Sequence, residues 1–302
     1  MTRHLLDMDD LDADELALIL DLAERDSPRQ VLRGKGAALL FEKPSLRTRS
    51  SMELAVVDLG GHPVSILGEE ASIDRRETAE DIARVLSRYH AVIGARVFEH
   101  DKVERLAGAS QVPVVNLLSD AAHPCQTLAD LLTLRQRFGG LKGRIVAYVG
   151  DGNNVCRSLL LGAALCGVEA RVATPHGYEP DDDAVEWARD RVDVLVTNDP
   201  VAAVAGADAV YTDVWASMGQ EEEAEGRRRA FAGFTVDERL MAAARPEAVF
   251  LHCLPAHRGE EVTASVLEGP QSVVWQQAEN RLHAQRGLLL WLLGGGDEGG
   301  QV

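Results

Sequence analysis

The densest group of polar residues in the chain is Glu42-Lys43-Pro44-Ser45-Leu46-Arg47-Thr48-Arg49. It follows an apolar run typical of a strand and precedes a helical pattern. Backbone N–H groups at the start of a helix attract an anion, and the helix dipole adds to this attraction. Two arginines in the same turn suit a phosphate group in bidentate fashion. The segment therefore predicts a phosphate cradle, although a helix N-cap followed by surface arginines explains the same residues.

Two further groups follow expected strands. His123-Pro124-Cys125-Gln126 offers a histidine and a glutamine that can both donate to a carbonyl oxygen. Gly150-Asp151-Gly152-Asn153-Asn154 has the start of a dinucleotide-binding fingerprint, but Val155 stands where the third glycine belongs. We interpret this segment as a tight turn that presents the amides of Asn153 and Asn154. A capping loop histidine and a plain Gly-Asn turn remain the alternatives.

The last two groups carry acidic, thiol and imidazole side chains. Asp213-Val214-Trp215-Ala216-Ser217-Met218-Gly219 combines a carboxylate, which suits an ammonium group, with a hydroxyl that suits a carboxylate; an amino-acid zwitterion needs both. In His252-Cys253-Leu254-Pro255-Ala256-His257 a cysteine stands between two histidines, which suggests a nucleophile or a metal site. The histidine spacing differs from that of HExxH and no acidic ligand set accompanies it, so we predict no metal. An Asx turn and a buried structural cysteine are the alternatives.

Short β-branched runs alternate with amphipathic stretches, which predicts an α/β fold with parallel sheets covered by helices on both faces. Phe138-Gly139-Gly140 ends a long helix before a strand restarts, so we place a domain boundary there. The prediction is two doubly wound domains, residues 1–139 and 140–302, with the active site in the cleft between them. The final helix, about 277–293, is expected to pack back on the first domain, and 221–229 to be a solvated surface segment. The expected strands are 37–41, 64–67, 91–95, 114–117, 144–149, 170–173, 194–197, 209–212 and 249–252, and the expected helices include 11–24, 48–59, 78–89, 127–138 and 155–166.

Composition excludes several classes of protein. The chain has 302 residues, of which 46% are hydrophobic and 26% charged, which excludes a wholly disordered chain. Its net charge of −17 repels nucleic acid and anionic lipid, so we expect neither a nucleic-acid nor a membrane partner. No signal peptide and no apolar run of the ~20 residues that span a bilayer is visible. The four cysteines lack CxxC spacing, which favours free thiols in the cytoplasm.

Together and in this order, the motifs resemble the aspartate/ornithine carbamoyltransferase family. The resemblance runs from about Phe41 to the final helix, and six ordered motifs make it highly specific. The segments at 213–219 and 252–255 are similar to those of members that use ornithine, rather than aspartate, as the acceptor. The family motifs are S-x-R-T-R at 45–49, H-P-x-Q at 123–126, D-G-N-N at 151–154, D-x-x-x-S-M-G at 213–219, H-C-L-P-x-H-R-G at 252–259 and A-E-N-R at 278–281.

The resemblance implies transfer of the carbamoyl group from carbamoyl phosphate to the side-chain amine of L-ornithine, giving L-citrulline and phosphate in arginine biosynthesis. It implies no cofactor, because carbamoyl phosphate is already activated, and a homotrimer or a multiple of trimers. The first domain would bind carbamoyl phosphate and the second ornithine. Catalytic roles are implied for Arg96, His123 and Cys253. Carbamoyl phosphate would contact Ser45, Leu46, Arg47, Thr48, Arg96, His123, Gln126, Cys253, Leu254 and Arg281, and ornithine would contact Asn154, Asp213, Ser217 and Met218.

The chain departs from the family pattern in the loop after Leu67. Ser72 and Asp74 stand where the family usually has Gln and Gly, in a loop that reaches a neighbouring subunit in related enzymes. Three other functions remain as alternatives. One is a carbamoyltransferase for putrescine or acetylornithine. The others are a nicotinamide-dependent dehydrogenase, which Val155 disfavours, and a non-catalytic binding relative, which the intact arginine and histidine set disfavours.

Overall fold

The computed structural model describes residues 2–71, 73–216 and 223–294 of the chain. The chain forms two compact units. Unit 1 comprises the residues up to Leu132 together with the chain from Asn280 onward, and unit 2 comprises Thr133–Glu279. Both boundaries fall inside helices, α5 (Pro124–Phe138) and α12 (Val274–Leu292), so each of these helices belongs in part to both units.

Unit 1 is built on a four-stranded parallel sheet with the order β2-β1-β3-β4. The chain moves outward from β1 to β2 and then places β3 on the other side of β1. Since such crossovers are right-handed, the helices before and after this reversal cover opposite faces of the sheet. Leu40 and Ile93 of the sheet share one hydrophobic cluster with Leu86 and Leu106 of the covering helices. The elements are η1 (Met8–Asp10), α1 (Ala13–Ala23), β1 (Gly36–Phe41), α2 (Leu46–Asp58), β2 (His62–Leu67), η2 (Gly68–Ala71), α3 (Ala79–Tyr89), β3 (His90–Arg96), α4 (His100–Ala109) and β4 (Val114–Leu118).

Unit 2 repeats this plan with a five-stranded parallel sheet in the order β7-β6-β5-β8-β9. Here the reversal lies between β5 and β8. Its main cluster contains aromatic side chains, with Trp215 stacked on Phe231.

The two parallel sheets confirm the predicted fold class, and the nine predicted strands are all present within two residues of their expected ends. The elements are β5 (Ile145–Val149), α6 (Asn154–Leu165), β6 (Glu169–Ala173), α7 (Asp182–Arg189), β7 (Val194–Thr197), α8 (Pro200–Val204), β8 (Ala209–Thr212), α9 (Ala224–Ala230), α10 (Glu238–Met241), β9 (Val249–His252) and α11 (Ala264–Leu267).

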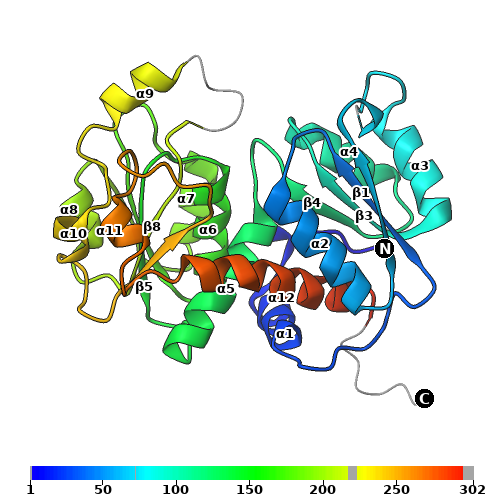
Figure 1. Cartoon of the computed structure of the whole chain (residues 1–302), viewed down its shortest axis with the longest axis horizontal. Helices are drawn as coiled ribbons and strands as arrows, with labels where there is room; N and C mark the ends of the chain where they lie inside the picture. The colour runs from blue at the N-terminus through cyan, green and yellow to red at the C-terminus, as the bar shows by residue number, and fades with distance from the viewer. Residues whose placement is uncertain (1, 72, 217–222, 295–302) are drawn as a thin grey trace. The chain divides into compact units, whose positions relative to one another are not determined.

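Helices α1 and α12 lie side by side in unit 1 (Figure 1). Gly287 of α12 faces the backbone of α1 so closely that an added Cβ would lie 2.5 Å from the carbonyl oxygen of Ile19. The neighbouring Arg286 donates from Nη2 to the carbonyl oxygens of Ala23 and Arg25, at 3.0 and 2.8 Å. A cation is favourable there, because α1 ends at these carbonyls. A glycine contact and a charged hydrogen bond therefore dock the end of α12 on α1.

The expectation of a solvated segment at 221–229 is wrong for Arg227; residues 221 and 222 lie outside the described residues. Arg227, on α9, is buried and donates from Nη1 to Asp151 Oδ2 at 2.7 Å and to the carbonyl oxygen of Trp215 at 2.9 Å. A run of charges in the sequence does not tell which of its members turns inward. Here one arginine anchors the segment that follows β8.

The helices and the cysteines bear on membrane insertion and on disulfide formation, respectively. Every helix among the described residues is too short or too polar to cross a membrane. All four cysteines are thiols rather than disulfides. Burial raises the pKa of Cys125 to about 11 and that of Cys166 to about 12, so both stay protonated and behave as small apolar groups.

The close contact between α12 and α1 predicts that Gly287 does not tolerate a larger residue. Gly287→Ala should lower the free energy of unfolding by about 1–3 kcal/mol, because the added methyl group collides with backbone. Helix propensity alone predicts a gain of up to about 1 kcal/mol for this change. Gly108→Ala, on α4, where a Cβ meets no atom within 4 Å, is the matched control and should show that gain. Urea denaturation of both variants measures the difference, and equal stabilities would show that α1 gives way without cost.

Candidate functional site

Each sheet reverses its strand order at one point, and in open parallel sheets ligands bind beyond the carboxyl ends of the strands at this point. In unit 1 the reversal lies between β1 and β3, whose final residues Phe41 and Arg96 are partners in register. In unit 2 it lies between β5 and β8, which are followed by Asp151 and Asp213. Of the predicted site residues that the structure describes, those of unit 1 lie at the carboxyl ends of β1, β3 and β4 and those of unit 2 at the carboxyl ends of β5, β8 and β9, except for Arg281, which lies on α12.

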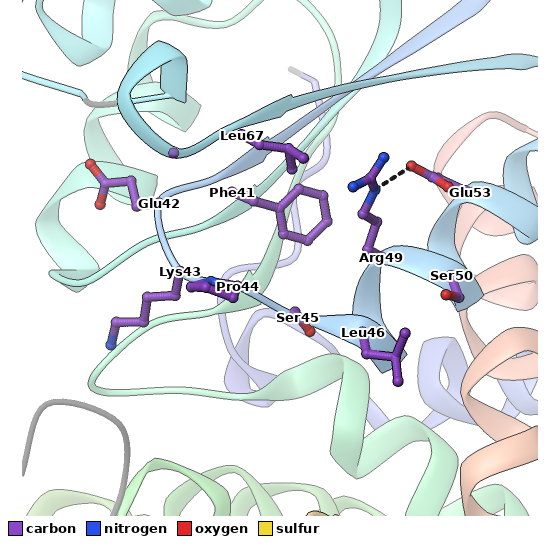
Figure 2. A pocket seen from close by; sticks show the side chains of 11 residues that line it. Phe41, Glu42, Lys43, Pro44, Ser45, Leu46, Arg49, Ser50, Glu53 and Leu67 are labelled. Carbon is purple, nitrogen blue, oxygen red and sulfur yellow. Dashed lines mark hydrogen bonds and ion pairs between the residues drawn. The ribbon is translucent and has the colours of Figure 1, made fainter. Parts of the chain in front are cut away.

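Helix α2 begins directly beyond β1. Ser45 is its N-cap, and the Ser45 hydroxyl oxygen accepts the backbone N–H of Thr48 at 3.2 Å. Arg47 lies in the first turn and is half-buried. Arg49 follows two residues later, about 200° around the helix, and donates instead to Glu53 Oε1 at 2.8 Å (Figure 2). This bond makes Arg47 the stronger phosphate candidate of the two arginines in this turn.

Three helices that are distant in sequence meet at Arg281. Its Nη1 donates to Gln126 Oε1 at 2.6 Å, and its Nη2 donates to Thr48 Oγ1 at 3.1 Å. Gln126 in turn donates from Nε2 to Asp130 Oδ1 at 2.8 Å. All four side chains are buried, so Asp130 fixes the amide of Gln126 with its oxygen toward the guanidinium. Asp130 was not predicted as a site residue, although its spacing from Gln126 places both on one face of α5.

Arg96 and His123 complete the group in unit 1. Both are buried, Arg96 at the end of β3 and His123 just before α5. Burial, together with the charges of Arg281, Arg96 and Arg47, lowers the pKa of His123 well below its usual value. His123 is therefore a neutral imidazole surrounded by guanidinium groups. We call Arg47, Thr48, Arg96, His123 and Arg281 the cationic cluster; it suits an anion that carries a polarised carbonyl group.

A cavity of about 480 Å³ opens beside the start of α2 (Figure 2). Of the predicted site residues that the structure describes, only Ser45 and Leu46 line it. Lys43, which also lines the cavity, lies over the ring of Phe98, with Nζ 4.5 Å from the ring centroid, and burial lowers the pKa of Lys43. The lining is Phe41, Glu42, Lys43, Pro44, Ser45, Leu46, Arg49, Ser50, Glu53, Leu67 and Gly68.

The loop after β2 is anchored inside unit 1. Glu42 accepts the backbone N–H groups of Ile73 and Phe98, each at 3.1 Å. Asp74 accepts two bonds from Arg105, at 2.8 and 3.0 Å, and these bonds lower the pKa of Asp74. Ser72 lies outside the described residues. At position 74 the departure from the family pattern thus serves a contact within this chain.

Asp213 is the centre of the site in unit 2. Its Oδ1 accepts the thiol of Cys253 at 2.8 Å and the backbone N–H of Val214 at 2.8 Å, while its Oδ2 accepts Asn153 Nδ2 at 3.0 Å. Asn153 is also the N-cap of α6, where its Oδ1 accepts two backbone N–H groups. The turn therefore uses Asn153 to fix the carboxylate, a role that the sequence analysis did not assign. Asn154 is half-buried beside it, and Ser217 and Met218 lie outside the described residues.

The loop after β9 carries Cys253 and Leu254, which the sequence placed in the site. The side chain of His252 is turned into the interior of unit 2, and both ring nitrogens are engaged. Nδ1 accepts the backbone N–H of Leu254 at 2.8 Å, and Nε2 lies 3.2 Å from Glu261 Oε1. His252 is therefore part of the scaffold of this loop.

Among the described residues, two groups of side chains are close enough to hold a metal ion, which corrects the expectation that no acidic residues accompany the histidines. In the group of Asp213, His252 and Cys253, both ring nitrogens of His252 are already hydrogen-bonded. In the group of His257, Glu260 and Glu261, Glu260 pairs with Arg228 at 2.9 Å. These existing bonds favour structural roles over metal binding. The groups are Asp213 with His252 and Cys253, and His257 with Glu260 and Glu261.

Comparison with known proteins gives matches over nearly the whole chain. Residues 3–136 match the carbamoyl-P binding domain of the aspartate/ornithine carbamoyltransferase family, and residues 142–292 match its Asp/Orn binding domain. An ornithine carbamoyltransferase of Acidothermus cellulolyticus is 54% identical over 97% of this chain and 97% of its own. The solved ornithine carbamoyltransferase of Pyrococcus furiosus is 49% identical, with a TM-score of 0.93 over 97% of this chain and 98% of its own. That of Thermus thermophilus is 52% identical, with a TM-score of 0.89 over 97% and 99%.

The buried, neutral state of His123 predicts a pH dependence of stability. Below a pH of about 6.5 the unfolded chain takes up a proton on this histidine and the folded chain does not, so acid favours unfolding. Between about pH 6.5 and 5.5 the unchanged protein should lose about 1 kcal/mol more unfolding free energy than His123→Gln, which lacks the titrating group. His176→Gln, at an exposed histidine, should follow the unchanged protein. Urea denaturation at each pH measures this, and parallel losses in the unchanged protein and His123→Gln would show that folded His123 is protonated.

Proposed function

The chain belongs to the aspartate/ornithine carbamoyltransferase family, and we propose that it transfers the carbamoyl group of carbamoyl phosphate to the side-chain amine of L-ornithine, releasing L-citrulline and phosphate. The observation that carries this proposal is the make-up of the two carboxyl edges: cationic donors in unit 1 and a carboxylate–thiol pair in unit 2. An anionic acyl donor suits the first and an amine acceptor suits the second. Relatives about half identical over nearly full length, named ornithine carbamoyltransferase, support the same reaction.

We assign carbamoyl phosphate to the cationic cluster of unit 1. The phosphate group meets the start of α2, where the N–H groups of the first turn and the side chain of Arg47 stabilise its charge. Arg96 and the neutral His123 donate to the carbonyl oxygen, where negative charge develops during the reaction. Gln126 acts here through Arg281, which it orients. The remaining contacts assigned to this substrate are Ser45, Leu46, Thr48, Gln126, Cys253, Leu254 and Arg281.

We assign ornithine to unit 2, with Asp213 as the partner of an ammonium group. Its carboxylate is held by three neutral donors: an amide, a backbone N–H and a thiol. Cys253, whose thiol contacts Asp213, contacts the reacting amine and forms no covalent intermediate. The other ornithine contacts are Asn154, Ser217 and Met218.

The chemical step needs an uncharged nitrogen. For a lysine-like amine with a pKa of about 10.4, deprotonation near pH 7.4 costs about 4 kcal/mol. The neutral nitrogen attacks the carbamoyl carbon, a tetrahedral oxyanion forms, and the carbon–oxygen bond to phosphate breaks. Arg96 and His123 stabilise the oxyanion, and Arg47 stabilises the departing phosphate. Carbamoyl phosphate is itself activated, so the proposed reaction requires no cofactor.

We also propose a homotrimer, or a multiple of trimers, located in the cytoplasm and acting in arginine biosynthesis. Leu46, Leu54 and Val57 are exposed on one face of α2, with 80%, 52% and 52% of their surfaces accessible, and a second copy of the chain would cover them. The four thiols fit a reducing compartment. One relative, from Pyrococcus furiosus, is named an anabolic ornithine carbamoyltransferase, which supports the biosynthetic direction.

The proposed reaction predicts a coupled release of two products. The purified chain, mixed with carbamoyl phosphate and L-ornithine, should form citrulline and inorganic phosphate in equal amounts, without added metal. Putrescine and acetylornithine, tested in parallel, should give much less product, because neither presents a free α-amino acid. Citrulline is measured colorimetrically and phosphate in the same sample. Phosphate release without citrulline, or a preference for putrescine, would refute the proposal.

The contact between Asn153 and Asp213 predicts an effect on ornithine alone. Asn153→Ser keeps a good N-cap for α6 but removes the donor to the carboxylate. Since hydrogen bonds to charged groups contribute about 1.5–3 kcal/mol, kcat/KM for ornithine should fall about tenfold or more. The KM for carbamoyl phosphate and the melting temperature should change little. Thr78→Ser, at the N-cap of α3, is the control for cap replacement and should leave all three quantities unchanged. An unaltered kcat/KM for ornithine in Asn153→Ser would remove Asn153 from the site.

A further inference from the structure

We propose that Glu261 is a positioning residue for the reaction: it holds Cys253 and Leu254 in place by joining the two ends of the loop that carries them. The inference rests on the proposed function, because it concerns residues assigned there to substrate contacts. Glu261 itself lies in the interior of unit 2 with none of its surface exposed, so it acts through other residues.

One carboxylate oxygen receives a hydrogen bond from each end of this loop. The loop leaves β9 after His252 and runs to His257. At its start, His252 Nε2 lies 3.2 Å from Glu261 Oε1, and neither side chain is exposed. At its end, the backbone N–H of His257 donates to the same oxygen. Glu261 thereby fixes the separation of the two ends.

His252 carries this constraint into the loop. Its Nδ1 accepts the backbone N–H of Leu254 at 2.8 Å, so that nitrogen carries no proton. The proton of the neutral ring is then on Nε2, where it can be donated to Glu261. Leu254 has a φ of 59°, a conformation that a residue with a side chain rarely adopts unless its surroundings impose it. The hydrogen bonds that link Glu261, His252 and Leu254 hold Leu254 in this conformation.

The position of the thiol depends on the same loop. Cys253 lies between His252 and Leu254, and its sulfur is 2.8 Å from Asp213 Oδ1. A loop whose ends separate would withdraw the sulfur from this carboxylate. We therefore expect the reactivity of the thiol to report on Glu261 even when no substrate is present.

A purely stabilising role explains Glu261 less well. Burial of a carboxylate is costly, and Oε2 of Glu261 is buried with no hydrogen-bond partner among the described residues. An apolar side chain of similar size would avoid this cost. The two hydrogen bonds to the ends of the loop account for an acceptor oxygen at this position.

The test compares four variants of the full chain. Glu261→Ala removes the acceptor, Glu261→Asp keeps the charge but withdraws the oxygen by one methylene, and Glu261→Gln keeps an acceptor oxygen in place. Glu260→Gln is the control at a neighbouring glutamate that pairs with Arg228. For each folded variant we would measure kcat for citrulline formation. We would also measure the rate of alkylation of Cys253 by iodoacetamide without substrates, with the modified peptide identified by mass spectrometry.

Glu261→Ala and Glu261→Asp should lower kcat about tenfold or more and raise the alkylation rate of Cys253 several-fold, while Glu261→Gln and Glu260→Gln stay within about twofold of the unchanged protein. If Glu261→Ala does not fold, Glu261→Asp and Glu261→Gln decide the question. The proposal is overturned if a folded Ala or Asp variant leaves both quantities unchanged, or if Glu261→Gln is impaired as strongly as Glu261→Ala. If the unchanged protein makes no citrulline, the proposed function fails, but the alkylation rates still test the role of Glu261 independently.

Discussion

A buried guanidinium decides how unit 1 is assembled. Arg281 has only 3% of its surface exposed, and a buried charge without partners is strongly destabilising. It finds partners on α2 and α5, through Thr48 and Gln126, so the last helix has to return to the unit in which the chain began. The close contact of Gly287 with α1 makes that return sterically feasible. The same cation adds to the positive charge at the start of α2, so folding and the proposed binding of an anion depend on one interaction.

Asp151 and Asp213 both lie at the carboxyl edge of unit 2, but Asp151 stabilises the fold and Asp213 is the carboxylate assigned to the substrate. Asp151 is paired with Arg227, and burial raises the pKa of Asp151, so this group serves the fold. Asp213 is held by an amide, a backbone N–H and a thiol, none of which neutralises it. An ammonium group is therefore drawn to Asp213. The net charge of −17 matters less, since exposed charges are screened over about 8 Å at physiological salt.

Much of this arrangement follows from the sequence, because the periodicity of apolar residues and the positions of glycine and proline indicate backbone structure directly. Buried parallel strands appear as short β-branched runs, and polar residues after such runs must gather at the carboxyl ends of the sheets. The inward or outward direction of a single charged residue is not encoded in this way. Arg227 stands in a run of charges that looks solvated, and Arg49 looks equivalent to Arg47 until helix geometry separates them. The assignment of Arg227 depends on Asp151, which is distant in sequence, and their separation is defined only in the folded chain.

Several carboxylates of this chain share one structural role. A carboxylate has only acceptors, and its two oxygens can receive several donors at once. In this chain such groups lie behind the site and collect the donors that position it: Asp130 behind the amide of Gln126, Glu42 behind two loop N–H groups, and Glu261 behind the imidazole of His252. Each fixes the orientation of a neighbour without presenting a charge to the substrate. Asp130, Glu42 and Glu261 therefore contribute to the proposed chemistry by holding neighbouring groups in place, whereas Asp213 is the carboxylate assigned to the substrate.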